Sequence, residues 1–188
     1  MPLQPGDLLV ITRPAGPQAG TYQLSAPALT DFLSPPPVLG ITGLLWSSVR
    51  SAADNSWQAI CWSPELQLYA CVAGSGSGNR VMTSSDGRNW TLRTAAATNN
   101  WIGLCWAAEL GLLVALSSSG RGNRVMTSTD GISWSSRSSA ADNAWTSLCW
   151  SPQRELLVAV SSSGTGNRIM TSADGLSWMV RSSPADLG

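Results

Sequence analysis

Histidine is absent from this 188-residue chain, so the side chains that could take part in catalysis or binding are carboxylates, arginines, cysteines and tryptophans. A Ser-His-Asp triad and a Cys-His pair are therefore excluded. Glycoside hydrolysis remains conceivable, but it needs two carboxylates in distinct environments across one pocket. The glutamates Glu65 and Glu109 instead stand 44 residues apart, at equivalent positions. Positions that repeat identically do not provide the required asymmetry, so we expect no catalytic residues and no cofactor.

Arginines and glycines recur at the same interval. Arg80, Arg124 and Arg168 are equivalent to one another, which marks them as a structural position rather than a substrate-binding cluster. Each follows a Gly-x-Gly pair that lacks the third glycine and the following helix of a nucleotide-binding loop. We therefore interpret these pairs as loops between strands.

Three of the four cysteines also occupy one position of the repeat, directly before a tryptophan. They are Cys61, Cys105 and Cys149. We expect equivalent positions to lie far apart and the thiols to be small buried hydrophobic groups that do not pair. No Cys-x-x-Cys or Cys/His cluster is present, so we expect no metal site.

A second set of tryptophans could bind sugars, because an exposed indole stacks on a sugar face. The candidate ligand-binding residues are Trp57, Trp101, Trp145, Asn55, Asn100 and Asn143. The alternative is that each tryptophan is a core residue at the start of a strand.

These residues are positioned by a repeat of 44 residues. Tryptophans stand at 46, 90, 134 and 178, and two further series keep the same interval, so that all ten tryptophans belong to the repeat. The string Asn-Arg-Val-Met-Thr-Ser at 79–84 returns at 123–128 and, with one change, at 167–172. A fixed period of this length indicates a repeated supersecondary unit.

Within one repeat the sequence predicts four short strands and no helix. In the third copy we expect strands at 145–150, 156–160, 167–172 and 177–181, with a tight turn at Asp174-Gly175. The fold class is therefore all-β, with four-stranded antiparallel, β-propeller-like blades. We place the blades at 46–89, 90–133 and 134–182, followed by a tail at 183–188.

The Asp-Gly turn is similar to the Asp-box, or BNR, repeat of sialidase-like propellers. That pattern normally reads Ser-x-Asp-x-Gly-x-Thr-Trp, whereas this chain is one residue shorter between Asp and Gly. The residues that match are Ser84, Asp86, Gly87, Trp90, Ser128, Asp130, Gly131, Trp134, Ser172, Asp174, Gly175 and Trp178. The resemblance implies a structural role, in which Ser and Asp bond the turn backbone and Trp packs inside the blade.

The first 45 residues lack the repeat. We expect a hairpin from strands at 6–12 and 21–24, a helix that begins at Ser25, and a Pro-rich linker at 34–45. Residues 1–33 resemble the N-terminal attachment modules of tailed-phage virion proteins, those of cyanophages especially. This resemblance implies that residues 1–33 dock to other virion proteins.

The charge is balanced, with 11 acidic and 11 basic residues. A neutral surface has no electrostatic footprint for nucleic acid. No apolar run is long enough to span a membrane, and the N-terminus lacks the features of a secretory signal. We therefore expect synthesis in the host cytoplasm and location in the virion, at the tail or particle surface.

Three blades are fewer than the four to eight of a usual propeller. The array is therefore partial or completed by oligomerisation, and we expect a homo-oligomer with one surplus outer strand. The function that we expect is a non-enzymatic tail-fibre or baseplate-associated component that attaches to the host surface, with glycans as candidate ligands. The alternatives are a propeller lectin outside any virion and a relic of a sialidase-like glycosidase.

Overall fold

A computed structural model of the chain describes residues 8–12, 21–25 and 48–186. The chain divides into two compact units, Met1–Ser48 and Val49–Gly188, each of which is described by itself. No helix in the described ranges is long and apolar enough to cross a membrane.

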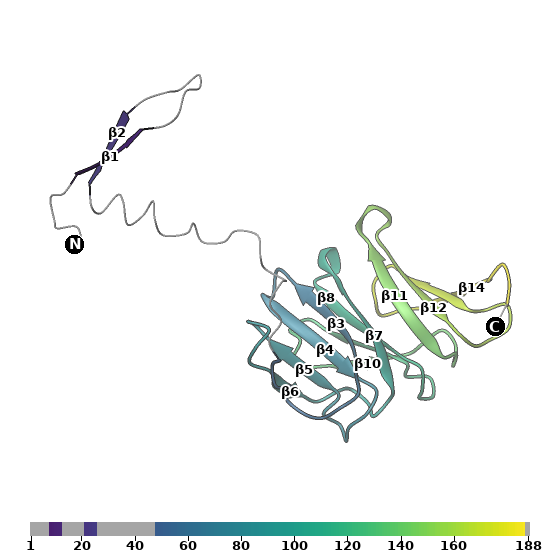
Figure 1. Cartoon of the computed structure of the whole chain (residues 1–188). Coiled ribbons are helices and arrows are strands. Elements are labelled where there is room, and N and C mark those ends of the chain that lie inside the picture. The colour runs from purple at the N-terminus through teal and green to yellow at the C-terminus, as the bar shows by residue number, and fades with distance from the viewer. Residues whose placement is uncertain (1–7, 13–20, 26–47, 187–188) are drawn as a thin grey trace. The chain divides into compact units, whose positions relative to one another are not determined.

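The N-terminal unit contains one antiparallel hairpin (Figure 1). Strand β1 (Leu8–Thr12) pairs with β2 (Thr21–Ser25), with Leu8 opposite Ser25 and Thr12 opposite Thr21. This is the hairpin that the sequence predicts, although Ser25 ends β2. The helix expected after Ser25, the Pro-rich linker and Trp46 lie outside the described residues.

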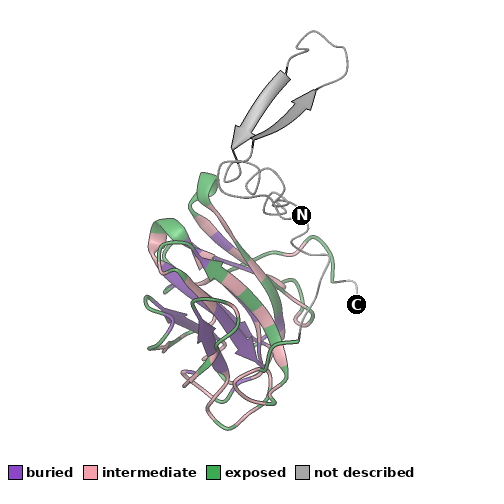
Figure 2. Ribbon diagram, turned by 60° about the vertical axis from the view of Figure 1, so that its left-hand side comes forward, coloured by how far each residue is buried: buried purple, intermediate pink, exposed green. Residues whose placement is uncertain are grey.

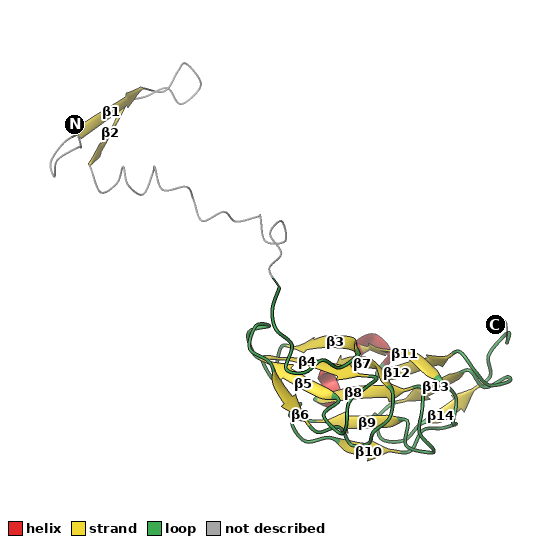
Figure 3. Cartoon of the chain, turned by 60° about the horizontal axis from the view of Figure 1, so that its bottom comes forward, coloured by secondary structure: helices red, strands yellow, loops and turns green. Residues whose placement is uncertain are grey.

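The second unit consists of three four-stranded antiparallel sheets, which follow one another along the chain (Figures 1 and 3). The first sheet contains β3 (Trp57–Ser63), β4 (Leu68–Ala73), β5 (Val81–Ser84) and β6 (Thr91–Arg93). The second contains β7 (Trp101–Ala107), β8 (Leu112–Ser117), β9 (Val125–Ser128) and β10 (Ser135–Arg137). The third contains β11 (Trp145–Ser151), β12 (Leu156–Ser161), β13 (Ile169–Ser172) and β14 (Met179–Arg181). Two short 3-10 turns, Ala108–Leu110 and Pro152–Arg154, are the helical elements of the described residues.

The observed sheets correct the predicted division of the repeat. Each sheet is formed by one continuous segment, at 57–93, 101–137 and 145–181. The short strand that follows each Asp-Gly turn pairs with the strand before it, so Thr91 lies opposite Thr83 in the same sheet. The divisions predicted at 89/90 and 133/134 therefore move to the loops at 94–100 and 138–144. The sequence also predicts outer strands that start near the tryptophans at 46, 90, 134 and 178; residues 48–50, the described part of the first of these segments, form no strand.

The sheets pack against one another through two faces of different composition. We call the face toward the following sheet the leading face and the face toward the preceding sheet the trailing face. Val72 and Val81 on the first leading face pack with Trp101, Leu113 and Met126 on the second trailing face. The same arrangement recurs between the second and third sheets.

The middle sheet is covered on both sides, which explains its sequence. All six residues of β8 are buried. Figure 2 shows buried strands in purple in the interior of the array. The hydrophobic effect across these two faces is therefore the main force that holds the array together.

Two glycines with nearly the same backbone conformation allow the effect of this packing to be measured separately from that of backbone strain. Gly175 and Gly166 both have a positive φ, of 71° and 70°, which disfavours any residue with a Cβ atom. A Cβ at Gly175 would lie 2.7 Å from the Cδ2 atom of Leu112 in the second sheet, whereas a Cβ at Gly166 would meet nothing within 4 Å.

We therefore expect Gly175→Ala to lower the free energy of unfolding by about 1–2 kcal/mol more than Gly166→Ala, because overpacking is added to the same backbone strain. The measurement is chemical denaturation followed by tryptophan fluorescence. Equal losses in the two variants would contradict close packing of the Asp-Gly turn on the preceding sheet.

Candidate functional site

The Asp-Gly turn is built by one hydrogen-bond pattern in all three sheets. In the second sheet the Ser128 hydroxyl oxygen accepts a hydrogen bond from the Gly131 N–H at 2.8 Å and donates one to Asp130 at 2.9 Å. The Oδ1 atom of Asp130 accepts hydrogen bonds from the backbone N–H groups of Ile132 and Ser133, both at 2.8 Å. The polar groups of the turn are therefore occupied by its own backbone, as in other turns capped by short polar side chains.

The equivalent residues of the first and third sheets repeat this pattern. Ser84 with Asp86 and Ser172 with Asp174 make the same bonds at 2.8–2.9 Å. The structure thus places nine of the candidate residues in three turns, each stabilised by its own hydrogen bonds. They are Ser84, Asp86, Gly87, Ser128, Asp130, Gly131, Ser172, Asp174 and Gly175.

The tryptophans of these turns lie half-buried against the sheets. Trp134 packs on the core between the first and second sheets, and Trp178 packs on the core between the second and third. Their indole N–H groups donate to the carbonyl oxygens of Gly131 and Gly175, at 3.1 and 3.3 Å. Trp90 is also half-buried and lines a cavity on the first sheet.

The turn aspartates are stabilised in their charged form. The backbone N–H of Asn89, followed by that of Arg88, lowers the pKa of Asp86 well below its ordinary value. The largest effect on Asp130 is the hydrogen bond from the backbone N–H of Ser133, and on Asp174 that from Ser177; each lowers the pKa of the carboxyl group. Burial raises both pKa values by a smaller amount. These carboxylates therefore stay ionised at neutral pH, which suits hydrogen-bond acceptors and not proton donors.

The pH dependence of stability follows from these lowered pKa values. Each folded-state pKa lies below the unfolded value of about 4, so the stabilisation is present above that value and is lost as the pH falls through the folded pKa. We expect the melting temperature to decrease between about pH 5 and pH 2, and to decrease less in the triple variant Asp86→Asn/Asp130→Asn/Asp174→Asn. The control is Asp54→Asn, an exposed aspartate outside these turns, which should retain the wild-type slope. An unchanged slope in the triple variant would refute the assignment.

A second network joins each sheet to the loop that leads into the next sheet. Arg124 donates from Nε to the Gly120 carbonyl at 3.0 Å and from Nη1 to the carbonyls of Ser118 and Asn143, at 2.9 and 2.7 Å. Arg80 bonds Gly76, Gly74 and Asn99 in the same way. Arg80 and Arg124 are therefore structural, and each connects its own sheet to the loop that leads into the next one.

The asparagines in these loops complete the network. The Nδ2 atom of Asn99 donates to the Asn123 carbonyl at 2.8 Å, and Asn55 and Asn143 make the equivalent bonds to Asn79 and Asn167. The Gly-x-Gly pair makes room for this contact, because a Cβ atom at Gly120 would lie 2.3 Å from Nδ2 of Asn99. The glycine pairs connect strands, as the sequence predicts, and the first glycine of each pair also makes room for the asparagine side chains.

The arginine network gives a direct test of the connection between sheets. Arg124→Lys should lower the free energy of unfolding by about 1–3 kcal/mol, because one ammonium group cannot reach three separate carbonyl oxygens. Arg121→Lys is the matched control, since Arg121 is exposed in the same loop. Thermal unfolding measures both variants, and equal stability of the two would contradict this role.

The candidate ligand-binding residues lie in different environments from one another. Trp101 and Trp145 are fully buried, and their indole N–H groups donate to the carbonyls of Ala97 and Ala141 at 2.9 and 3.0 Å. Neither indole can stack on a sugar in this position, which corrects the prediction for these two residues and favours the core alternative. Trp57 makes the equivalent bond to Ala53 but is only half-buried.

The asparagine set also needs a correction. Asn55 and Asn143 are equivalent in the structure to Asn99, and Asn100 instead donates from its side chain to the Ser118 hydroxyl at 2.7 Å. An alignment at the interval of 44 residues would have identified Asn99 from the sequence. Asn99 and Asn143 are buried, so their amides serve the fold.

The repeated cysteines lie closer together than expected. Burial raises the pKa of Cys105 to about 12, and the neighbouring thiols of Cys61 and Cys149 contribute to that shift. Equivalent positions on adjacent sheets are thus neighbours, since the first strands of the sheets lie side by side (Figure 3). All four thiols are free, and the pKa of Cys61 and of Cys71 is also raised to about 12, chiefly by burial. Protonated thiols are poor nucleophiles at neutral pH.

Two contacts between sheets were not anticipated. The indole N–H of Trp106 donates to Glu65 at 2.6 Å, and that of Trp150 donates to Glu109 at 2.5 Å. Each bond joins one sheet to the turn of the preceding sheet. The tryptophan and the glutamate of each bond are 41 residues apart, so no sequence pattern within one repeat indicated the contact.

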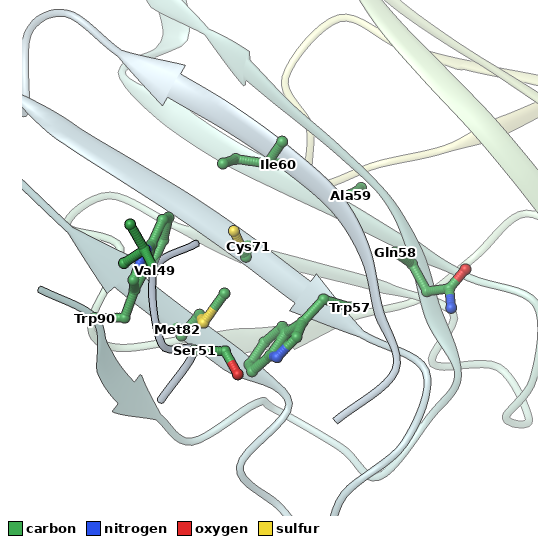
Figure 4. A pocket seen from close by; sticks show the side chains of 9 residues that line it. All are labelled: Val49, Ser51, Trp57, Gln58, Ala59, Ile60, Cys71, Met82 and Trp90. Carbon is green, nitrogen blue, oxygen red and sulfur yellow. The ribbon is translucent and has the colours of Figure 1, made fainter. Parts of the chain in front are cut away.

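One cavity of about 340 Å³ opens on the trailing face of the first sheet (Figure 4). Trp57, Met82, Cys71 and Trp90 point into it from the sheet, with Val49 and Ser51 alongside. Its lining is mostly apolar and includes no carboxylate. Among the described residues no group of three acidic, cysteine or histidine side chains could hold a metal ion.

Comparison with known proteins adds no assignment: no family model matches the chain, and no curated protein matches it significantly.

Proposed function

We propose that the chain is a non-enzymatic structural component of a tailed-phage virion, located in the tail-fibre or baseplate region. The observation that carries the proposal is the division into a short N-terminal hairpin unit and a separate array of sheets. A docking element followed by a displayed β-rich module is the layout of a particle-bound protein. In this role residues 1–33 dock to other virion proteins and the array faces the host surface.

The hydrogen bonding of the array supports a scaffold role. The repeated serines, aspartates, asparagines and arginines bond backbone groups of the turns and of neighbouring loops. A hydrolase relic would instead need two carboxylates free to face one pocket. Hydrolysis of a sialoside by the purified chain would favour that alternative.

A lectin with a sugar-stacking tryptophan on every sheet is disfavoured, because Trp101 and Trp145 are buried. A contact with host-surface glycans remains part of the proposal, with the exposed loops as the contacting surface. Binding of the purified array to glycans, together with absence of the chain from particles, would favour a lectin outside any virion.

The test is incorporation into purified particles. We expect the full chain to be present and deletion of residues 1–33 to lower its copy number at least about tenfold, since a docking contact of even modest affinity would be lost. Quantitative mass spectrometry of the particles measures this ratio, and circular dichroism of the purified deletion variant checks that its sheets persist. Absence of the full chain from particles, or equal incorporation of the deletion variant, would overturn the proposal.

A further inference from the structure

The two ends of the array carry faces that are buried everywhere else in it. The leading face of the third sheet is equivalent to the faces that the first and second sheets bury against their successors. The trailing face of the first sheet is equivalent to the faces that the second and third sheets bury against their predecessors. These end faces can therefore be judged against two examples of each within the same chain.

The leading face of the third sheet keeps the apolar composition of a buried face, but no described segment of the chain covers Val160 on it. Val160 is 43% exposed, whereas Val72 and Leu116 at the same position are fully buried. Cys149 is exposed, whereas Cys61 and Cys105 are partly buried. A surface needs no apolar side chains at these positions, so their retention indicates a partner.

The trailing face of the first sheet shows the reciprocal pattern. Ile60 is 58% exposed, whereas Leu104 at the same position of the second sheet is 9% exposed and packs in the core. Trp57 is half-buried where Trp101 and Trp145 are fully buried. Figure 4 shows Ile60 and Trp57 on this open face, beside the cavity.

The two end faces also carry a donor and an acceptor that could form one hydrogen bond between two chains. Trp106 and Trp150 each donate an indole hydrogen bond to a glutamate of the preceding sheet, Glu65 or Glu109. In the third sheet Gln153 stands at the glutamate position, where its amide oxygen can accept the same bond. The indole donor that would meet it is Trp62, which is 37% exposed and finds no acceptor within the described part of the chain.

We propose that a second copy of this chain occupies both end faces, so that two chains close head to tail into one ring of six blades. The leading face of each third sheet packs on the trailing face of the partner's first sheet, in the manner of the two contacts inside the chain. Propellers have four to eight blades, and six is the one multiple of three in that range. This inference concerns the array alone and does not depend on the virion role.

The test is the solution mass of the full chain and of two single variants, Ile60→Glu and Val160→Arg. We expect a mass of two 19.7-kDa chains for the wild type. Each variant alone should be monomeric, with association weakened at least about 100-fold, because a charge would be buried without a partner. A mixture of the two variants should form a one-to-one complex, because one interface is then intact and the other pairs opposite charges.

Ile132→Arg is the matched control. Ile132 is 50% exposed, but it lies in the turn of the middle sheet, and arginine occupies the equivalent position at Arg88. This variant should keep the wild-type mass. Recovery of the complex in the mixture also shows that both single variants are folded.

Three other results would overturn the proposal. A monomeric wild type at all concentrations would mean that another segment or another protein covers the end faces. Loss of association in Ile60→Glu but not in Val160→Arg would indicate that like faces pair. A wild-type mass other than that of two chains would exclude the six-bladed ring.

Discussion

Packing of unlike faces between successive sheets is the interaction on which the rest of the structure depends. A four-stranded sheet with strands of three to seven residues cannot bury both of its faces by itself. The second sheet solves this by contacting a neighbour on each side, so that every residue of β8 is buried. The hydrophobic term is proportional to the apolar area removed from water, and each of the two core clusters contains side chains from two neighbouring sheets.

The polar residues of the repeat serve this packing. The Asp-Gly turns fold their own backbone and press a glycine against the preceding sheet, as Gly175 does against Leu112. The arginines and asparagines fix the loops that connect the sheets. A repeat with such specific hydrogen bonding determines the relative orientation of its units as well as the structure of each one. The same interactions explain why these residues recur at equivalent positions of the sheets.

Much of the array could be predicted from the sequence because its determinants are local. The apolar run at 156–160 and the Asp174-Gly175 pair specify strands and a turn within a few residues of themselves, and the observed strands Leu156–Ser161 and Ile169–Ser172 agree with that prediction. The role of the turn residues was predictable for the same reason, since Ser172 and Asp174 bond groups no more than three residues away. Repetition alone predicted a structural role for the arginines, but it did not identify the carbonyl oxygens that they bond.

The errors about the tryptophans and cysteines arose because their neighbours lie on another sheet. Trp101 and Trp145 begin strands whether they face solvent or a neighbouring sheet, and only the packing of the second and third sheets decided that they are buried. The cysteines were expected to be far apart because their separation along the chain says nothing about how closely the sheets are spaced. The sequence by itself determined the strands, the turns and the fact of repetition, because these depend on neighbours within one repeat. The tertiary structure alone decided how the sheets pack and which side chains remain exposed, because both depend on contacts between residues about 40 positions apart.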